Sequence, residues 1–232
     1  MKIFVITGTS KGIGKYLAES YLANEGNIVI GCSRGETTIW DERYHHYSLD
    51  VSDEQSITKM SKDVFRKFKK IDVLINNAGI ASMNHSLMTP GATAQKLINT
   101  NYMGTFLMCR EFAKLMSINK HGRIVNFSTV AVPLNLEGEL AYAASKSAVE
   151  TLTRVFSKEL GANGITCNCI GPTPIDTDLI RNVGEDKIEK LLELQAIKKK
   201  AEFKDVKNVI DFFISDHSNM VTGQTIYLGG VF

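Results

Sequence analysis

Short runs of apolar, β-branched residues alternate along the chain with longer segments in which apolar residues recur every three or four positions. The runs are typical of strands covered on both faces, and the longer segments are typical of amphipathic helices. They predict strands at Ile3–Thr7, Ile28–Cys32, Asp72–Asn76, Arg123–Ser128, Ile165–Ile170 and Thr225–Leu228, with a weaker candidate at Tyr44–Leu49. The longer segments predict helices at about 12–24, 53–69, 91–118, 141–161 and 204–215.

This alternation predicts right-handed βαβ units, in which helices cover both faces of a parallel sheet. The chain has 232 residues and shows no internal repeat, low-complexity tract or Pro/Gly-rich linker. Residues 1–232 are therefore expected to form a single α/β domain of the doubly wound, Rossmann type. The span from Arg34 to Asp50 is too short for a strand and a full crossover helix, so a stub or an extended loop is expected there.

Composition narrows the class of protein. With 44% hydrophobic and 22% charged residues, the chain is typical of a globular protein, and its net charge of +2 argues against a nucleic-acid partner. The first apolar run, Ile3–Ile6, is too short for a signal peptide, and no run approaches the ~18 residues of a membrane span. We therefore expect a cytoplasmic protein with no membrane partner. The cysteines match no zinc spacing, so no metal site is expected, and they are interpreted as buried free thiols: Cys32, Cys109, Cys167 and Cys169.

A glycine-rich turn, Thr7–Gly14, directly follows the first predicted strand and precedes the first predicted helix. Glycines there permit a tight turn, allow the backbone to approach a pyrophosphate, and leave the helix N-terminus pointing at the anion. Glycines also punctuate many ordinary turns, so the strand–turn–helix setting carries the argument for a dinucleotide. The spacing is Gly-x-x-x-Gly-x-Gly, which differs from the Gly-x-Gly-x-x-Gly of two-domain dehydrogenases.

Three further motifs carry candidate chemistry. Tyr142 and Lys146 are four residues apart on a predicted helix, so they share one face, where an ammonium would favour the phenolate. Ser128 ends a predicted strand, where ligands of open α/β sheets bind. Asn76–Gly79 follows another strand. Each has an ordinary alternative, respectively a surface helix pair, a capping serine and an Asn-rich turn.

In this order and at these spacings, the motifs resemble the short-chain dehydrogenase/reductase family in its single-domain form, of the 3-oxoacyl-carrier-protein-reductase-like type. The matching segments span nearly the whole chain: Thr7–Gly14, Asp50-Val51, Asn76–Gly79, Asn101-x-x-Gly104, Ser128, Tyr142-x-x-x-Lys146, Asn168–Thr177 and Thr222–Gln224. The resemblance implies a seven-stranded parallel sheet in the order 3-2-1-4-5-6-7, flanked by helices.

The resemblance also implies roles for individual residues. Tyr142 would be the general acid/base, and Lys146 would lower its pKa while holding the nicotinamide ribose. Ser128 would hydrogen-bond the substrate oxygen, and Asn101 would orient a water-linked proton path. The cofactor would contact residues from every motif: Gly8, Ser10, Lys11, Gly12, Ile13, Gly14, Ser33, Arg34, Asp50, Val51, Asn77, Ala78, Gly79, Tyr142, Lys146, Pro172, Ile175 and Thr177.

The choice between NADP(H) and NAD(H) depends on the end of the second strand. An acidic residue there hydrogen-bonds a ribose 2′-hydroxyl and repels a 2′-phosphate. This chain has Ser33 at that position, followed by Arg34, and Lys11 is expected to reach the same pocket. NADP(H) is therefore the predicted cofactor, although both cations suit ordinary exposed turns and Glu36 could serve a 2′-hydroxyl.

Two positions depart from the family pattern. The usual Pro-Gly after the sixth strand is Pro172-Thr173, which restricts the backbone beside the nicotinamide, and the usual Asp-Gly-Gly near the C-terminus is Leu228-Gly229-Gly230. The chain ends at Phe232, so no C-terminal tail is expected to close the site.

The predicted activity is hydride transfer between NADP(H) and a ketone or secondary alcohol. The alternatives are an NADP-sensing regulator without turnover, which the complete catalytic set disfavours, and a sugar-nucleotide-modifying enzyme, which usually needs a longer chain. The substrate is expected to contact Thr129–Leu140 and a helical, partly apolar lid at 178–203. Within the lid, Lys198–Lys200 would either attract an anionic group or form a solvated run.

The predicted assembly is a homotetramer or homodimer. It rests on the family resemblance and on the two long predicted helices, at about 102–118 and 141–161, which carry apolar residues on more than one side.

Overall fold

Seven parallel strands form one sheet in the order β3-β2-β1-β4-β5-β6-β7, which confirms the predicted fold class and strand order. The computed structural model describes residues 1–181 and 183–231. The strands are β1 (Ile3–Thr7), β2 (Ile28–Ser33), β3 (Tyr44–Ser48), β4 (Val73–Asn76), β5 (Gly122–Phe127), β6 (Ile165–Gly171) and β7 (Thr225–Tyr227).

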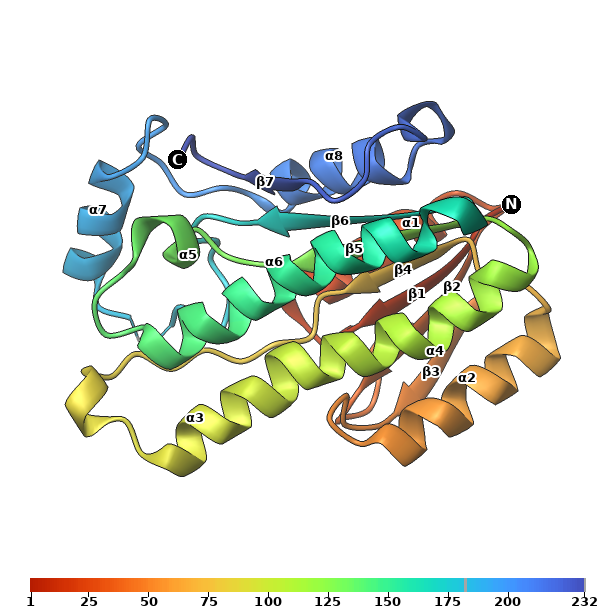
Figure 1. Cartoon of the computed structure of the whole chain (residues 1–232), viewed down its shortest axis with the longest axis horizontal. Helices are drawn as coiled ribbons and strands as arrows, with labels where there is room; N and C mark the ends of the chain where they lie inside the picture. Colours follow the sequence, from red (N-terminus) through yellow and green to blue (C-terminus); the bar gives the residue numbers. More distant parts are fainter. Residues whose placement is uncertain (182, 232) are drawn as a thin grey trace.

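Helices cover both faces of the sheet (Figure 1). One face packs against α2 (Glu54–Phe68), α4 (Gly104–Ile118) and α6 (Leu140–Leu160), which lie in front of the sheet in this view. The other face packs against α1 (Gly12–Leu22) and α8 (Phe203–Ile214). Each face buries its own cluster of apolar side chains, as a doubly wound sheet requires.

The helix expected over 91–118 is interrupted. It consists of α3 (Gly91–Leu97), a π-helical segment at Ile98–Met103, and α4. A π-helical turn accommodates an extra residue and is frequent at functional sites. Asn101 lies in this segment, and the periodicity of apolar residues gave no sign of it.

The short crossover between β2 and β3 contains no helix, in agreement with the expected extended loop. Ile39 is buried against the α1/α8 face, whereas Trp40, the only tryptophan in the chain, is 91% exposed. Ile39 therefore holds the loop against the sheet, and Trp40 beside it is exposed to solvent.

The expected lid contains α7 (Glu185–Glu193), of which only Ile188 is buried. It lies with α5 (Ala131–Leu134) beyond the carboxyl ends of β5 and β6 (Figure 1). Short 3₁₀ turns occupy Ser86–Met88, Gly161–Asn163 and Asp216–Ser218. The edge of the sheet where the strands end is thus where loops from distant parts of the sequence meet.

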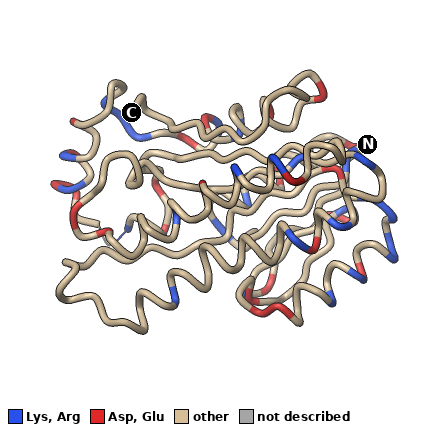
Figure 2. Tube along the Cα trace, in the orientation of Figure 1, with Lys and Arg blue, Asp and Glu red and all other residues tan. Residues whose placement is uncertain are grey.

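Charge is spread over the molecule instead of forming one basic face. Lys and Arg positions alternate with Asp and Glu along much of the trace (Figure 2). All four cysteines are buried free thiols, as interpreted from the sequence. Among the helices within residues 1–181 and 183–231, we find none with the length and apolar character to span a bilayer.

Candidate active site

Tyr142 and Lys146 lie one turn apart on α6, and both are buried. The Lys146 Nζ donates a hydrogen bond of 2.8 Å to the carbonyl of Phe127, the last residue of β5. Burial lowers the pKa of Lys146 to about 8. This contact places Lys146 at the carboxyl end of β5.

The pKa of Tyr142 moves in the direction opposite to the prediction. Burial raises it to about 12, a hydrogen bond with the Thr129 hydroxyl opposes that rise, and the charge of Glu139 adds to it. Desolvation disfavours the charged phenolate, and it is the largest cause of the shift. The phenol is therefore protonated at neutral pH.

The Asn101 side chain is held by three hydrogen bonds close to Lys146. Its side-chain amide donates to the Ile80 carbonyl and the Ser145 hydroxyl, each at 2.9 Å, and its Oδ1 accepts from the Ile80 amide at 2.9 Å. A Cβ on Gly79 would lie 3.2 Å from the Asn101 Oδ1 and 3.4 Å from the Lys146 Nζ. The structure therefore brings Gly79, Asn101 and Lys146 together.

Ser128 is not brought to Tyr142. Its hydroxyl donates to the Glu150 Oε1, which also accepts a hydrogen bond of 2.5 Å from the Tyr227 hydroxyl. Ser128 and Glu150 are both buried, so this carboxylate is held by two neutral donors within the protein. The expectation that Ser128 faces the substrate is therefore not met by its position, because its side chain points to α6, beneath the site.

Thr129, the next residue along the chain, lies beside Tyr142. Its hydroxyl is the side-chain partner of Tyr142 and also accepts a 3.2 Å hydrogen bond from the Ala131 amide. Ser128 and Thr129 are adjacent, so the sequence alone does not decide which of the two hydroxyls lies beside Tyr142. One feature of the sequence could have separated them. Glu150 lies one turn beyond Lys146 on α6, and a buried carboxyl group there needs a hydroxyl as hydrogen-bond donor.

The glycine-rich turn is built as predicted. Gly8 and Gly12 have φ of +76° and +58°, a region that favours glycine. A Cβ on Gly14 would lie 2.3 Å from the Gly8 carbonyl oxygen, so no other residue fits there without a shift. Ser10, Lys11 and Ile13 complete the turn into α1. The glycines therefore allow a tight turn that packs closely against Asn77, and a tight glycine turn at the start of a helix suits a pyrophosphate.

The neighbouring β4 segment is fastened to this turn. Asn77 donates to the Thr7 carbonyl at 2.9 Å, and the Ala78 amide donates to the Thr7 hydroxyl at 2.9 Å. Thr177 approaches from the other side, since a Cβ on Gly12 would contact its methyl group at 3.7 Å. Asn77–Gly79, the glycine turn and Thr177 therefore form one surface, as expected of a cofactor site.

Three further predicted cofactor residues follow β3 and β6. Asp50 follows β3; burial raises the pKa of its carboxyl, but hydrogen bonds from Ser52 and the charge of Arg34 hold it below its usual value. Val51 is buried against Gly104, so its side chain belongs to the core. After β6, the Pro172 carbonyl accepts from the Val130 amide at 3.2 Å.

Ile175 is also buried, within the apolar cluster of the α1/α8 face. Ser33 is buried at the end of β2, and Arg34 is exposed beside it. These two adjacent residues therefore end β2 with one side chain covered and the other open to solvent.

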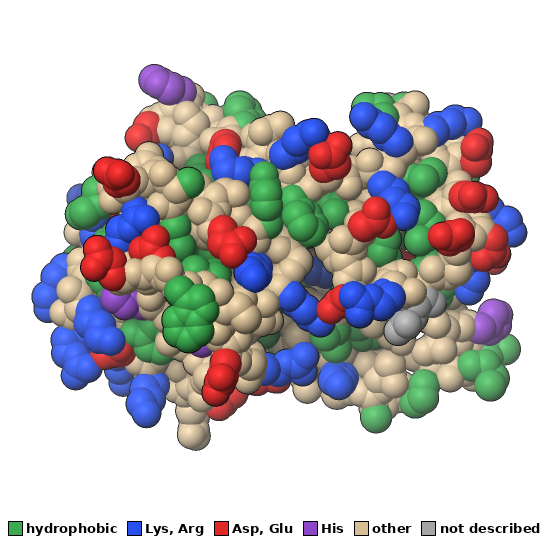
Figure 3. All heavy atoms as spheres, turned by 180° about the vertical axis from the view of Figure 1, so that it is seen from behind, with side chains coloured by type: hydrophobic (Ala, Val, Ile, Leu, Met, Phe, Trp, Pro, Cys, Tyr) green, Lys and Arg blue, Asp and Glu red, His purple; other side chains and the backbone are tan. Residues whose placement is uncertain are grey.

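Lys11 does not point to the Arg34 end of the site. Its Nζ forms an ion pair of 2.6 Å with Asp178, which also pairs with Arg181. The pair joins the glycine turn to the segment that precedes α7. The surface on this side is hollowed near its centre, and Lys and Arg side chains border the hollow (Figure 3).

The two departures from the family pattern contact the same segment. The Thr173 hydroxyl accepts a hydrogen bond of 2.5 Å from Gln195, which follows α7. The next two amides, of Ala196 and Ile197, donate to the carbonyls of Gly230 and Gly229 at 3.2 and 2.9 Å. Thr173 and the C-terminal glycines thus anchor the far end of the lid.

The lysine run does not form an open anion site. Lys198 pairs with Glu193 at 2.9 Å and Lys200 with Asp176 at 2.6 Å. Of its two interpretations, the contacts favour the surface run.

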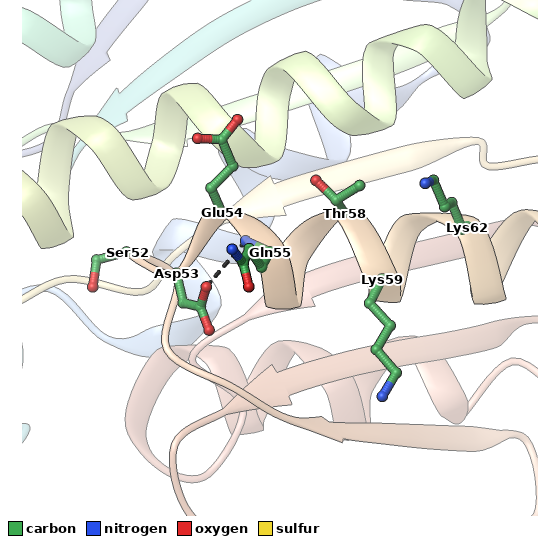
Figure 4. A pocket seen from close by; sticks show the side chains of 7 residues that line it. All are labelled: Ser52, Asp53, Glu54, Gln55, Thr58, Lys59 and Lys62. Atoms are coloured by element: carbon green, nitrogen blue, oxygen red, sulfur yellow. Dashed lines mark hydrogen bonds between the residues drawn. The ribbon is translucent and has the colours of Figure 1, made fainter.

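A shallow depression lies elsewhere, along the outer side of α2 (Figure 4). It is lined by Ser52, Asp53, Glu54, Gln55, Thr58, Lys59 and Lys62. None of these residues belongs to the predicted site, and their side chains diverge. Within the described part of the chain, no three His, Cys, Asp or Glu side chains gather in a way that could hold a metal ion.

Comparison with known proteins gives the family. The model of the enoyl-(acyl carrier protein) reductase family matches residues 8–230. The chain is 31% identical to the 3-oxoacyl-[acyl-carrier-protein] reductase of Buchnera aphidicola subsp. Baizongia pistaciae (99% of this chain, 96% of that protein). It is 32% identical to the (2S)-[(R)-hydroxy(phenyl)methyl]succinyl-CoA dehydrogenase subunit of Thauera aromatica (99% and 95%).

Solved structures of enzymes with related names have the same fold. Levodione reductase superimposes with a TM-score of 0.91 at 26% identity, covering 99% of this chain and 96% of that one. The ligand-free aldohexose dehydrogenase of Thermoplasma acidophilum gives a TM-score of 0.88 at 26% identity, with 99% and 93% covered. The chain therefore belongs to the short-chain dehydrogenase/reductase family of oxidoreductases.

Proposed function

We propose that the protein interconverts a ketone and a secondary alcohol with NADP(H). The observation that carries this proposal is the arrangement of Tyr142, Thr129 and Lys146 near the carboxyl end of β5, in a fold that also has a tight glycine turn between β1 and α1. A phenol and a second hydroxyl in contact can both reach one substrate oxygen. The glycine turn is where a dinucleotide pyrophosphate fits.

The chain's own residues would handle the proton. A bound nicotinamide supplies the hydride chemistry. In ketone reduction, Tyr142 donates its proton to the substrate oxygen while Thr129 hydrogen-bonds the same atom. Lys146 lies one turn from Tyr142 on α6, and its ammonium would bind the ribose hydroxyls of the coenzyme.

The pKa of Tyr142 suits the role of a proton donor at neutral pH. With a pKa of about 12, the phenol already carries the proton that reduction needs. Oxidation of an alcohol needs the phenolate, so it should become easier as the pH rises towards the pKa of Tyr142. Ketone reduction is therefore the direction in which we propose to assay the protein at neutral pH.

The coenzyme choice rests on Ser33 and Arg34. Ser33 leaves no acidic group at the end of β2, and the exposed Arg34 guanidinium can bind a 2′-phosphate bidentately. Lys11 contributes less than the sequence suggested, since Asp178 holds it. NADP(H) is the coenzyme that fits these charges.

The names of the similar proteins support a carbonyl or hydroxyl carbon as the reacting centre. They are named as reductases of a 3-oxoacyl group and of levodione, and as a dehydrogenase of an aldohexose. Around Tyr142, the side chains of Ile80, Ala131 and Leu136 form an apolar cluster. We propose that the substrate's carbon skeleton lies against this cluster.

We also propose that the protein is a homodimer or homotetramer. On α4, Leu107, Phe112 and Met116 are buried, whereas Phe106 is only partly covered and packs edge-on against Phe156 of α6. The partly exposed Phe106 and Phe156 rings suit contact with a second copy of the chain. Sedimentation velocity at micromolar concentration would show a dimer or tetramer, and a 26 kDa species alone would contradict the proposal.

A panel of ketones tests the activity. β-Keto thioesters, small diketones, sugars and steroids would be compared by the rate of NADPH oxidation, with NADH as the alternative coenzyme. The matched variant Tyr142→Phe keeps the ring and removes the transferable proton, so turnover on any accepted ketone should fall by ~10² or more. Near-normal turnover in this variant would rule out the proposed mechanism.

A further inference from the structure

A chain of hydrogen bonds links the glycine turn to the end of β2. The Thr9 hydroxyl contacts the Tyr44 hydroxyl at 2.7 Å, and the Tyr44 hydroxyl contacts the His46 Nδ1 at 3.0 Å. The His46 Nε2 lies 2.9 Å from the Gly35 carbonyl oxygen. Thr9 lies on the turn that would bind the pyrophosphate, and Gly35 directly follows Arg34.

The direction of these bonds follows from their last member. A carbonyl oxygen only accepts, so the His46 Nε2 must donate to Gly35. In a neutral imidazole, Nδ1 is then the acceptor, and the Tyr44 hydroxyl donates to it. The Thr9 hydroxyl in turn donates to Tyr44. Every group in the chain has its partner, with the proton of His46 on Nε2.

The residues around these hydrogen bonds are packed closely against them. A Cβ on Gly31 would lie 2.1 Å from the Tyr44 Oη and 2.5 Å from the Thr9 Oγ1, so β2 must have glycine where the two hydroxyls cross it. Thr9 and Tyr44 are buried. The Gly35 carbonyl also accepts from the Ser33 hydroxyl at 2.9 Å. The turn at Ser33–Gly35 is therefore held by two side chains.

We propose that His46 is a positioning residue that sets the preference for NADP(H) by fixing the backbone that carries Arg34. The ligand concerned is the 2′-phosphate of the adenosine ribose, so the inference rests on the proposed coenzyme. An exposed arginine loses conformational freedom when it binds a phosphate, and a backbone that is already fixed reduces that loss. NADH has no 2′-phosphate and gains little from a fixed Arg34.

The adjacent histidine provides a matched control. His45 and His46 are neighbours on β3, so their side chains point to opposite faces of the sheet. The His45 ring packs against Phe68 of α2 at 5.1 Å between centroids and has no part in the chain of hydrogen bonds. Replacing either residue by alanine removes the same group from the same strand.

The test measures the dissociation constants of NADPH and NADH by calorimetry for the wild type, His46→Ala, Tyr44→Phe and His45→Ala. We expect His46→Ala to weaken NADPH about 10-fold, as for the loss of one or two hydrogen bonds, while NADH changes less than about 2-fold. Tyr44→Phe keeps the ring and should give a smaller loss of the same kind. His45→Ala should leave the ratio of the two constants unchanged.

Retained binding of NADH shows that each variant is folded, so a loss confined to NADPH supports the proposal. An equal loss of both coenzymes, or an unchanged ratio in His46→Ala, would overturn it while leaving the coenzyme assignment intact. A wild type that binds NADH as tightly as NADPH would instead overturn the proposed coenzyme, and this inference with it.

Discussion

Exchanging the adjacent hydroxyl residues one at a time separates catalysis from stability. The structure directs the Ser128 hydroxyl to the buried Glu150 and the Thr129 hydroxyl to Tyr142. Ser128→Ala removes a hydrogen bond to a carboxyl group, and Thr129→Val removes a hydroxyl at the reacting phenol with almost no change in shape. The two variants should therefore fail in different assays.

The magnitudes follow from what each hydroxyl contacts. A hydrogen bond to a charged group contributes ~1.5–3 kcal/mol to stability, and Tyr227 still satisfies Glu150 after the exchange, so ~1.5–2 kcal/mol is expected for Ser128→Ala. For a chain of this length, that is a decrease in Tm of ~3–8 °C. Loss of one donor to a reacting oxygen costs ~10² in kcat, so Thr129→Val should lose that factor with a decrease in Tm of only ~2–4 °C.

The assays are thermal unfolding by circular dichroism and the rate of NADPH oxidation on an accepted ketone, with both variants measured side by side. Ser128→Ala should keep kcat within about 3-fold of the wild type. If Ser128→Ala lost ~10² in kcat while Thr129→Val kept its activity, the assignment of the two hydroxyls would be wrong.

Three other substitutions test the electrostatics and packing around the site. Glu139→Gln removes a charge that adds to the effect of burial on the pKa of Tyr142, so this pKa falls and the alkaline loss of ketone reduction moves to lower pH in a profile of kcat/KM. Lys146→Met should abolish activity yet unfold at higher temperature at pH 7, because burial holds the pKa of the lysine at about 8. Gly31→Ala should cost ~1–3 kcal/mol in urea unfolding, because its Cβ would lie 2.1 Å from the Tyr44 Oη.

The control for the charge effect is Glu137→Gln, an exposed change two residues away that should leave the pH profile where it is. For Lys146→Met, the pH dependence of stability follows from whether the folded or the unfolded state binds the proton of Lys146 more tightly. Its folded pKa is lowered, so wild-type stability rises from pH 8 to ~10.4, and the advantage of Lys146→Met should narrow over that range. An advantage that stayed constant from pH 7 to ~10.4 would contradict the burial effect.

Strand positions were predictable because a buried parallel strand is apolar along its whole length. β1 was predicted at its observed bounds, and β5 was displaced by one residue. The π-helical segment that contains Asn101 could not be predicted, because its extra residue is tolerated through the packing of Asn101 against Ile80 and Ser145. Such contacts depend on two other segments of the chain.

The sequence predicted which residues belong to the candidate site better than it predicted which side chains contact one another there. Lys11 was expected near Arg34, yet it pairs with Asp178, which lies far away in the sequence. The sequence likewise gives no reason to link Thr9 with His46, since the link depends on the glycine at position 31 and on the register of β2 against β3. Side-chain partners across strands are set by register, which the pattern of apolar residues specifies only coarsely.

The pKa of Tyr142 shows the same limit in its chemistry. Spacing on a helix places Lys146 beside it and predicts stabilisation of the phenolate. Burial acts on both groups, however, raising one pKa to about 12 and lowering the other to about 8, so each is shifted towards its neutral form. The sign of the shift therefore depends on how deeply α6 is covered, which is a property of the tertiary fold. A buried phenol that keeps its proton suits the donation of that proton to a ketone, so the burial of α6 supports the proposed role of Tyr142 as a proton donor.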